Sequence, residues 1–176
     1  MKKKIISALL VTAAVLSAAS CQGQSGSKTT DTAKPADEKP AVTEEAKSVS
    51  AADVTKAVLD EIPINSAFEK TKDTLVDYFG KLDIDSLTDF SFYLCASGAY
   101  PDEIAFFTFA SEEDAEKAVP VVQERLDEQI ELYETYTPKE FYKLENAVIK
   151  QSGKYVYYLV TSDNEKAESI VKGLIG

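Results

Sequence analysis

Few residues of this chain have the types and spacing that chemistry requires. The 176 residues include no histidine, which excludes a histidine general base, a Ser-His-Asp triad and a histidine metal site within the chain. Two cysteines are too few for a disulfide framework or a structural zinc site. A formal charge of −11 argues against a protein that neutralises nucleic-acid phosphates. We therefore expect no metal, no cofactor and no nucleic-acid partner.

The remaining candidates for chemistry lie between residues 83 and 98. The acidic run at 83–89 begins like a calcium loop, but it lacks glycine at the sixth position and glutamate at the twelfth, which favours an acidic turn. Cys95 lies in an apolar run with no histidine to activate it, which predicts a buried, inert thiol. Ser97 belongs to no G-x-S-x-G motif. A serine–lysine pair at Ser97 stays open, because the chain has 18 lysines.

The N-terminus has the pattern of an export signal. Three lysines precede the uncharged run at 5–19, which is too short to span a membrane comfortably. This order of charge, apolar run and small residues predicts a signal peptide over residues 1–20. The segment Ala18-Ala19-Ser20-Cys21 resembles the lipobox of bacterial lipoproteins. The resemblance implies that Cys21 is lipidated, as in palmitate-bearing lipoproteins, and several acyl chains would anchor the protein stably in a membrane.

The composition changes again after Cys21. Residues 22–49 contain glycine, proline and many small or charged residues, but no aromatic residue, leucine or isoleucine. Such a segment buries too little apolar surface to fold, so we predict a lipidated cysteine and disordered polar linker over 21–49. Residues 50–176 have a globular pattern of about the usual domain length. We therefore expect one α+β domain there.

Capping boxes, in which Ser or Thr is followed three residues later by an acidic residue, mark five predicted helix starts. They begin at Ser50, Ser66, Ser111, Thr137 and Ser162. The first two predict N-terminal helices over about 50–62 and 66–79, and the third predicts a long helix over about 112–136.

Four strand-like runs lie between these helices, at 89–96, 103–109, 144–151 and 154–161. They predict a small antiparallel sheet built from two β-hairpins, each followed by a helix (ββαββα), behind two N-terminal helices. The alternation of side chains places tyrosines 93, 155 and 157 on definite faces of this sheet. They would form a recognition surface if one face is open, or the edge of the core if helices cover both faces.

Arg125 is the only arginine in the chain, and we predict that it pairs with Glu103. From the end of the second strand back to Glu103 is about 23 Å, at roughly 3.3 Å per residue. From Ser111 to Arg125 along the following helix is about 21 Å, at 1.5 Å per residue. The two side chains should therefore lie at the same level, where a guanidinium can hold a carboxylate with two hydrogen bonds. Glu128, one turn along the helix, and Glu145 are the alternative partners.

Several short motifs occur together in a recognisable order. They are the lipobox, Asp102-Glu103-Ile104, Arg125, Tyr136-Thr137-Pro138-Lys139-Glu140 and Gly153-Lys154-Tyr155. From about residue 54 to the C-terminus the chain resembles the clostridial-type lipoproteins that contain domain of unknown function 4358. The resemblance implies an envelope lipoprotein of a Gram-positive bacterium. It implies no particular activity, because none is established for the family. It marks six residues as structural candidates: Glu103, Arg125, Tyr136, Pro138, Gly153 and Tyr155.

Together these patterns predict an acidic lipoprotein of the cell envelope. We expect it to be held in the cell membrane by lipid on Cys21, with its domain on the extracytoplasmic side. With no catalytic motif in the sequence, we expect a non-enzymatic binding or scaffolding module for an unknown envelope protein or ligand. The alternative is a small envelope hydrolase that uses Ser97 and a lysine.

Overall fold

A five-stranded antiparallel sheet organises the chain in the computed structural model, which describes residues 48–176. The predicted signal peptide, Cys21 and nearly all of the predicted linker lie outside the described residues. The elements, in chain order, are α1 (Ala51–Glu61), β1 (Ala67–Glu69), the 3-10 helix η1 (Lys72–Asp77), β2 (Leu87–Cys95), β3 (Glu103–Phe109), α2 (Glu112–Tyr136), α3 (Tyr142–Glu145), β4 (Val148–Ser152), β5 (Tyr155–Val160) and α4 (Asn164–Ile175).

The two predicted hairpins are confirmed, and they join through their second strands. The sheet order is β1-β2-β3-β5-β4, so that β3 and β5 lie at its centre. The register pairs Glu103 with Val160 at one end of these strands and Thr108 with Tyr155 at the other. Gly153 forms the turn of the β4–β5 hairpin with a φ of 53°, a left-handed conformation in which a side chain would be strained.

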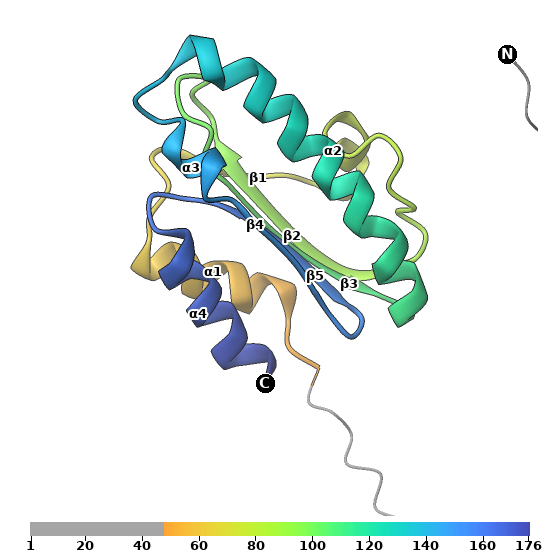
Figure 1. Cartoon of the computed structure of the whole chain (residues 1–176). Helices are drawn as coiled ribbons and strands as arrows, with labels where there is room; N and C mark the ends of the chain where they lie inside the picture. Colours follow the sequence, from red (N-terminus) through yellow and green to blue (C-terminus); the bar gives the residue numbers. More distant parts are fainter. Residues whose placement is uncertain (1–47) are drawn as a thin grey trace, which may run out of the picture. The chain divides into compact units, whose positions relative to one another are not determined.

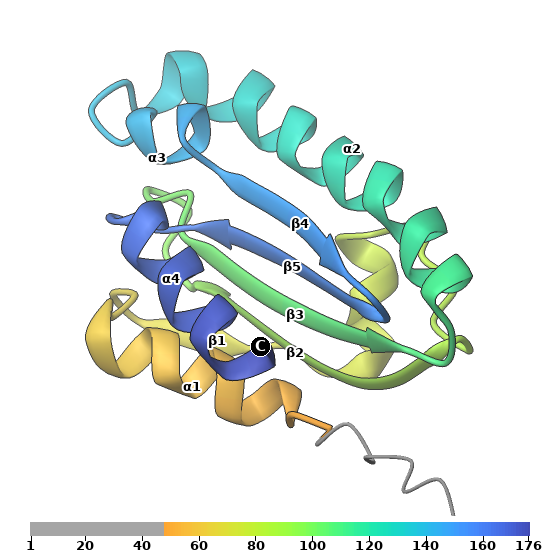
Figure 2. The ribbon, with the colours of Figure 1, turned by 60° about the horizontal axis from the view of Figure 1, so that its bottom comes forward.

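Helices cover both faces of the sheet (Figures 1 and 2). On one face α2 packs over a core that includes Phe92, Phe107 and Val156. On the other face α1 and α4 pack over Phe106 and Tyr157. The covered faces explain why β3 is buried along its whole length. They also place two of the three tyrosines in the covered core, because Tyr157 belongs to it and Tyr155 packs against it, whereas Tyr93 is half-buried and belongs to neither cluster.

The predicted second helix at 66–79 is wrong. Ser66 has a φ of 52°, and the residues after it form β1 and then η1. In β1, Phe68 pairs with Leu94 and Glu69 pairs with Tyr93, which adds an edge strand to β2. The capping-box pattern is local, whereas this strand forms because β2 offers it an unpaired edge.

The other capping boxes give mixed results. Ser111 caps α2, with its Oγ accepting from the backbone N–H of Asp114 at 3.1 Å. The predicted helix start at Thr137 is wrong, because Thr137 ends α2 and the next helix, α3, begins only at Tyr142. The cap of α4 is Asp163, one residue after the predicted Ser162.

The N-terminus of α1 is capped from a distance. Ser50 precedes the helix but makes no side-chain cap. Instead Oδ2 of Asp89, in β2, accepts a hydrogen bond from the backbone N–H of Ala51 at 2.8 Å. The positive end of the helix dipole also stabilises a carboxylate at this position. In the described part of the chain, no helix combines the length and the apolar character needed to cross a membrane.

Candidate functional site

The predicted pair of Glu103 and Arg125 is confirmed, at the start of β3. Nε of Arg125 donates to Oε2 of Glu103 at 3.2 Å, and Nη2 donates to Oε1. The Arg125 side chain is 13% exposed and the Glu103 side chain 4%. Glu128, the alternative on the same helix, lies farther away, with its Oε2 at 3.8 Å from Nη1. The bidentate pair therefore ties α2 to the central strand of the sheet.

Aromatic and amide groups enclose this pair. Cζ of Arg125 lies 5.2 Å from the centre of the Tyr78 ring, within range of a cation–π contact. With its amide turned so that the oxygen faces Arg125, Gln129 accepts from Nη1 and Nη2 at 3.1 and 3.0 Å. Burial raises the pKa of the Glu103 carboxyl, and the guanidinium opposes that rise. Every nitrogen of Arg125 is thus engaged, which indicates a structural clamp.

The hydroxyl of Tyr158 is the unsatisfied member of this cluster. Tyr158 is fully buried, and its hydroxyl lies beside the Glu103 carboxylate but outside hydrogen-bond geometry with any described residue. Burial raises the pKa of Tyr158 well above its usual value of 10.0, and the charge of Glu103 adds to the effect. The phenol therefore stays protonated in the folded protein.

A second buried pair starts at the neighbouring residue, Asp102, and the sequence analysis did not predict it. Nζ of Lys143 donates to Oδ2 and Oδ1 of Asp102 at 2.7 and 3.0 Å. It also lies 2.7 Å from Oε2 of Glu140 and 5.6 Å from the centre of the Tyr100 ring. Burial acts to lower the pKa of Lys143, but the hydrogen bonds to the two carboxylates outweigh it and raise that pKa. Lys143 is therefore a cation that holds α3 against the start of β3.

Asn164 connects α3 to the start of α4. Its Nδ2 donates to the backbone oxygens of Lys143 and Asn146 at 2.8 and 2.9 Å. Its Oδ1 accepts from the backbone N–H and the hydroxyl of Thr161 at 2.7 and 2.9 Å. Because each of these atoms is already bonded within the chain, Asn164 acts as a structural bridge.

Tyrosines lie exposed beside this buried network. The hydroxyl of Tyr133 donates to the backbone oxygens of Gly98 and Tyr100, at 3.1 Å each, and holds the β2–β3 loop against α2. Tyr100 and Tyr136 then line a hollow of about 390 Å³ together with Pro138. Tyr136 is 64% exposed, and Tyr142 in α3 is 44% exposed. We call Tyr100, Tyr136 and Pro138 the tyrosine surface.

The structure brings together only some of the residues that the motifs marked. Glu103 and Arg125 form the clamp, and Tyr136 and Pro138 belong to the tyrosine surface. Gly153 and Tyr155 lie at the opposite end of the sheet, where Tyr155 pairs with Thr108 and Ser152. These two residues therefore shape the hairpin turn and take no part in the site.

The other sequence candidates have local structural contacts. Ser97 accepts a hydrogen bond from the backbone N–H of Ala99 at 3.4 Å, and no described lysine donates to it. The buried thiol of Cys95 donates to the backbone oxygen of Asn65 at 3.0 Å. Asp83 accepts from the backbone N–H of Asp85 at 3.2 Å, as expected of an acidic turn. Within residues 48–176, no three carboxylate or thiol side chains gather as metal ligands.

Comparison with known proteins identifies a family and no individual relative. No curated protein and no solved structure matches the chain. The sequence model described as "Domain of unknown function (DUF4358)" matches residues 61–161, which include every strand, α2 and α3. The matched segment contains both buried ion pairs and the tyrosine surface. Because it spans more than half of the sequence, the chain belongs to the DUF4358 family.

Proposed function

We propose that this chain is a non-enzymatic binding or scaffolding module of the cell envelope. In this proposal lipid on Cys21 anchors it to the extracytoplasmic face of the cell membrane, and the residues up to 49 tether the domain. The domain then binds an envelope partner through the tyrosine surface. The observation that carries the binding role is the exposure of Tyr100 and Tyr136 beside a network of buried charges.

The chemistry of the tyrosine surface supports binding. Tyrosine is enriched at protein interfaces because it offers a large apolar ring together with a polar group. Here the backbone oxygen of Tyr100 accepts a hydrogen bond from the Tyr133 hydroxyl. The ammonium of Lys143 lies 5.6 Å from the centre of the Tyr100 ring, and both contacts position this side chain. Side chains that are already positioned lose less entropy on binding, so more of the contact energy remains as affinity.

The binding surface can be tested on living cells. We would carry out cross-linking from the cell surface with the wild-type chain and with the double variant Tyr100→Ala/Tyr136→Ala. We expect the cross-linked product to fall at least tenfold in the variant, as for a central aromatic contact. Leu174→Ala, which removes an exposed apolar side chain on α4, is the matched control and should leave the product unchanged. Equal cross-linking of the double variant and the wild type would contradict the proposal.

The anchor requires a separate test, because Cys21 lies outside the residues that the structure describes. Cys21→Ala removes the proposed lipid acceptor. We expect this variant to leave the membrane fraction and to appear in the soluble fraction or the medium. Tight retention of Cys21→Ala in membranes would show that something other than this cysteine anchors the chain.

A further inference from the structure

β4 is an edge strand with a free side. It pairs with β5 through Val148–Ser152, and the sheet order places no described strand beyond it. In an antiparallel pair, alternate residues turn their backbone N–H and C=O groups away from the partner strand. Such outward groups can bind another extended chain. With five residues, β4 offers about 17 Å of edge at 3.3 Å per residue.

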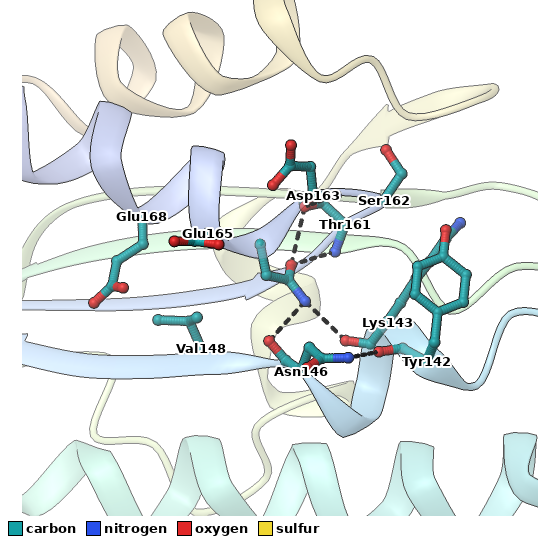
Figure 3. A pocket seen from close by; sticks show the side chains of 10 residues that line it. Tyr142, Lys143, Asn146, Val148, Thr161, Ser162, Asp163, Glu165 and Glu168 are labelled. Carbon is teal, nitrogen blue, oxygen red and sulfur yellow. Dashed lines mark hydrogen bonds between the residues drawn. The ribbon is translucent and has the colours of Figure 1, made fainter.

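A groove follows this strand between β4 and α4. One hollow, of about 340 Å³, lies at the start of β4 and includes Val148 and Glu165 (Figure 3). A second, of about 530 Å³, lies at its end and includes Lys150 and Lys172. Glu168 lines both hollows, so they are adjacent along α4. The twelve residues of α4 extend for about 18 Å, which matches the length of the β4 edge.

The two ends of the groove differ in charge. Asp163, Glu165 and Glu168 line the first hollow. Lys143 lines it too, but its ammonium is bound to Asp102 and Glu140. Lys150, Lys172 and Glu168 line the second hollow. Lys172 pairs with Glu168 at 2.7 Å, so the exposed Lys150 is the positive charge left at this end. An occupant of complementary charge would be basic at the first hollow and acidic at the second.

We propose that the free edge of β4 binds an extended peptide segment of a partner protein as an antiparallel strand, whose side chains on the α4 side of the sheet reach into this groove. β4 runs from the first hollow to the second, so an antiparallel peptide runs the opposite way. Its acidic side chain therefore comes first in its sequence, near Lys150, and its basic side chain comes later, beside Glu165. This inference goes beyond the proposed function, because it assigns a second binding surface, separate from the tyrosine surface, together with the class of partner and the direction in which the segment lies.

A second copy of this chain fits the groove less well. A symmetric dimer that pairs β4 with its own copy would be centred on the middle residue of the strand, which is Lys150. The two Lys150 side chains would then lie directly opposite each other, and like charges in that position destabilise a strand pair. The edge of β4 thus favours a different chain that places a carboxylate opposite Lys150.

The test uses the full chain and a phage-displayed library of random twelve-residue peptides. We expect selected peptides to carry an acidic residue before a basic one, with alternating apolar residues between them. The best peptide, made synthetically, should bind at least tenfold more weakly to Glu165→Lys. Glu131→Lys makes the same charge change on the exposed side of α2 and should bind like the wild type. Circular dichroism checks that both variants remain folded.

A second measurement tests the backbone contacts. Methylation of alternate backbone nitrogens of the peptide removes donors that a strand pair needs, so we expect at least a tenfold loss of binding. An unchanged affinity after methylation, or after Glu165→Lys, would overturn the proposal, as would the absence of any enriched peptide.

Peptides whose binding is lost in Tyr136→Ala but kept in Glu165→Lys would place the partner on the tyrosine surface. That result would retain the proposed function and reject the groove. Concentration-dependent dimerisation that the selected peptide competes away would instead assign the edge to a second copy.

Discussion

Two buried ion pairs begin at neighbouring residues, Asp102 and Glu103, but they are built differently. Glu103 meets Arg125 inside the interface between the sheet and α2, where one guanidinium supplies two hydrogen bonds to one carboxylate. Asp102 meets Lys143 beside the short helix α3, where one ammonium serves two carboxylates. The first pair joins regular elements of the core, and the second holds an irregular segment in place.

This difference decides how each pair responds when it is broken. A carboxylate left alone deep in the core cannot reach water, so its whole desolvation cost remains. Asp102 is also buried, with 9% of its side chain exposed, but it lies at the end of the β2–β3 loop, and Glu140 is 26% exposed. Local opening of this loop and of α3 can therefore bring both carboxylates to solvent when Lys143 is removed. We therefore expect the Glu103–Arg125 pair to control global stability and the Asp102–Lys143 pair to control local order.

The largest effect is expected from Arg125→Met. This change leaves Glu103 buried without a partner and should lower the free energy of unfolding by about 3–5 kcal/mol. Urea denaturation measures the loss. The double variant Glu103→Leu/Arg125→Met removes both charges and should recover most of the stability. If the free energy of unfolding falls by less than about 1 kcal/mol in the single variant, then the Glu103 carboxylate reaches water and is not buried without a partner.

A smaller loss is expected from Lys143→Met, about 2 kcal/mol in urea denaturation. Hydrogen exchange should show faster opening in α3 and in the β2–β3 loop, while the strands keep their protection. Lys139→Met alters an exposed lysine on the same segment and should change the free energy of unfolding by less than about 0.5 kcal/mol. Uniform loss of protection across β3 and β5 would mean that the two pairs act as one unit.

The smallest effect at neutral pH is expected from Tyr158→Phe. The hydroxyl has no hydrogen-bond partner, so its removal should change stability by less than about 1 kcal/mol at pH 7. Above pH 10 the unfolded chain loses this proton while the folded chain keeps it, because the pKa of Tyr158 is raised. The wild type therefore loses stability as pH rises through this range, by about 1.4 kcal/mol per pH unit from this group.

Urea denaturation of both proteins between pH 7 and pH 11 measures this difference. Tyr158→Phe should lose stability less steeply above pH 10, so that the two curves diverge. Parallel curves would show that Tyr158 has the same pKa in both states, and hence that its hydroxyl reaches water.

Local geometry made the pair of Glu103 and Arg125 predictable. Both residues lie in regular elements joined by a tight turn, so the rise per residue of a strand and of a helix placed them at the same level. Lys143 lies 41 residues after Asp102 in a four-residue helix. No periodicity links these two positions, and a buried lysine carries no signal in its own sequence neighbourhood.

Pairing with other strands also overrode local signals. Ser66 to Glu69 has the pattern of a capping box, but this segment completes the edge of β2. The two hairpin–helix units look alike in sequence, and yet α2 and α4 pack on opposite faces of the sheet (Figure 1). Helical amphipathicity shows that a helix buries one side, but it does not choose the face of the sheet.

The sequence by itself determined the helices α1, α2 and α4, the two hairpins and the clamp between β3 and α2, because each depends on periodicity or on short-range geometry. It also predicts the export signal and the lipidated cysteine, which depend on local composition. Only the tertiary structure decided the strand order, the covering of both faces, the pair of Asp102 and Lys143, and the groove beside β4. These features depend on which distant segments share buried surface, and that choice is made by the packing of the whole domain.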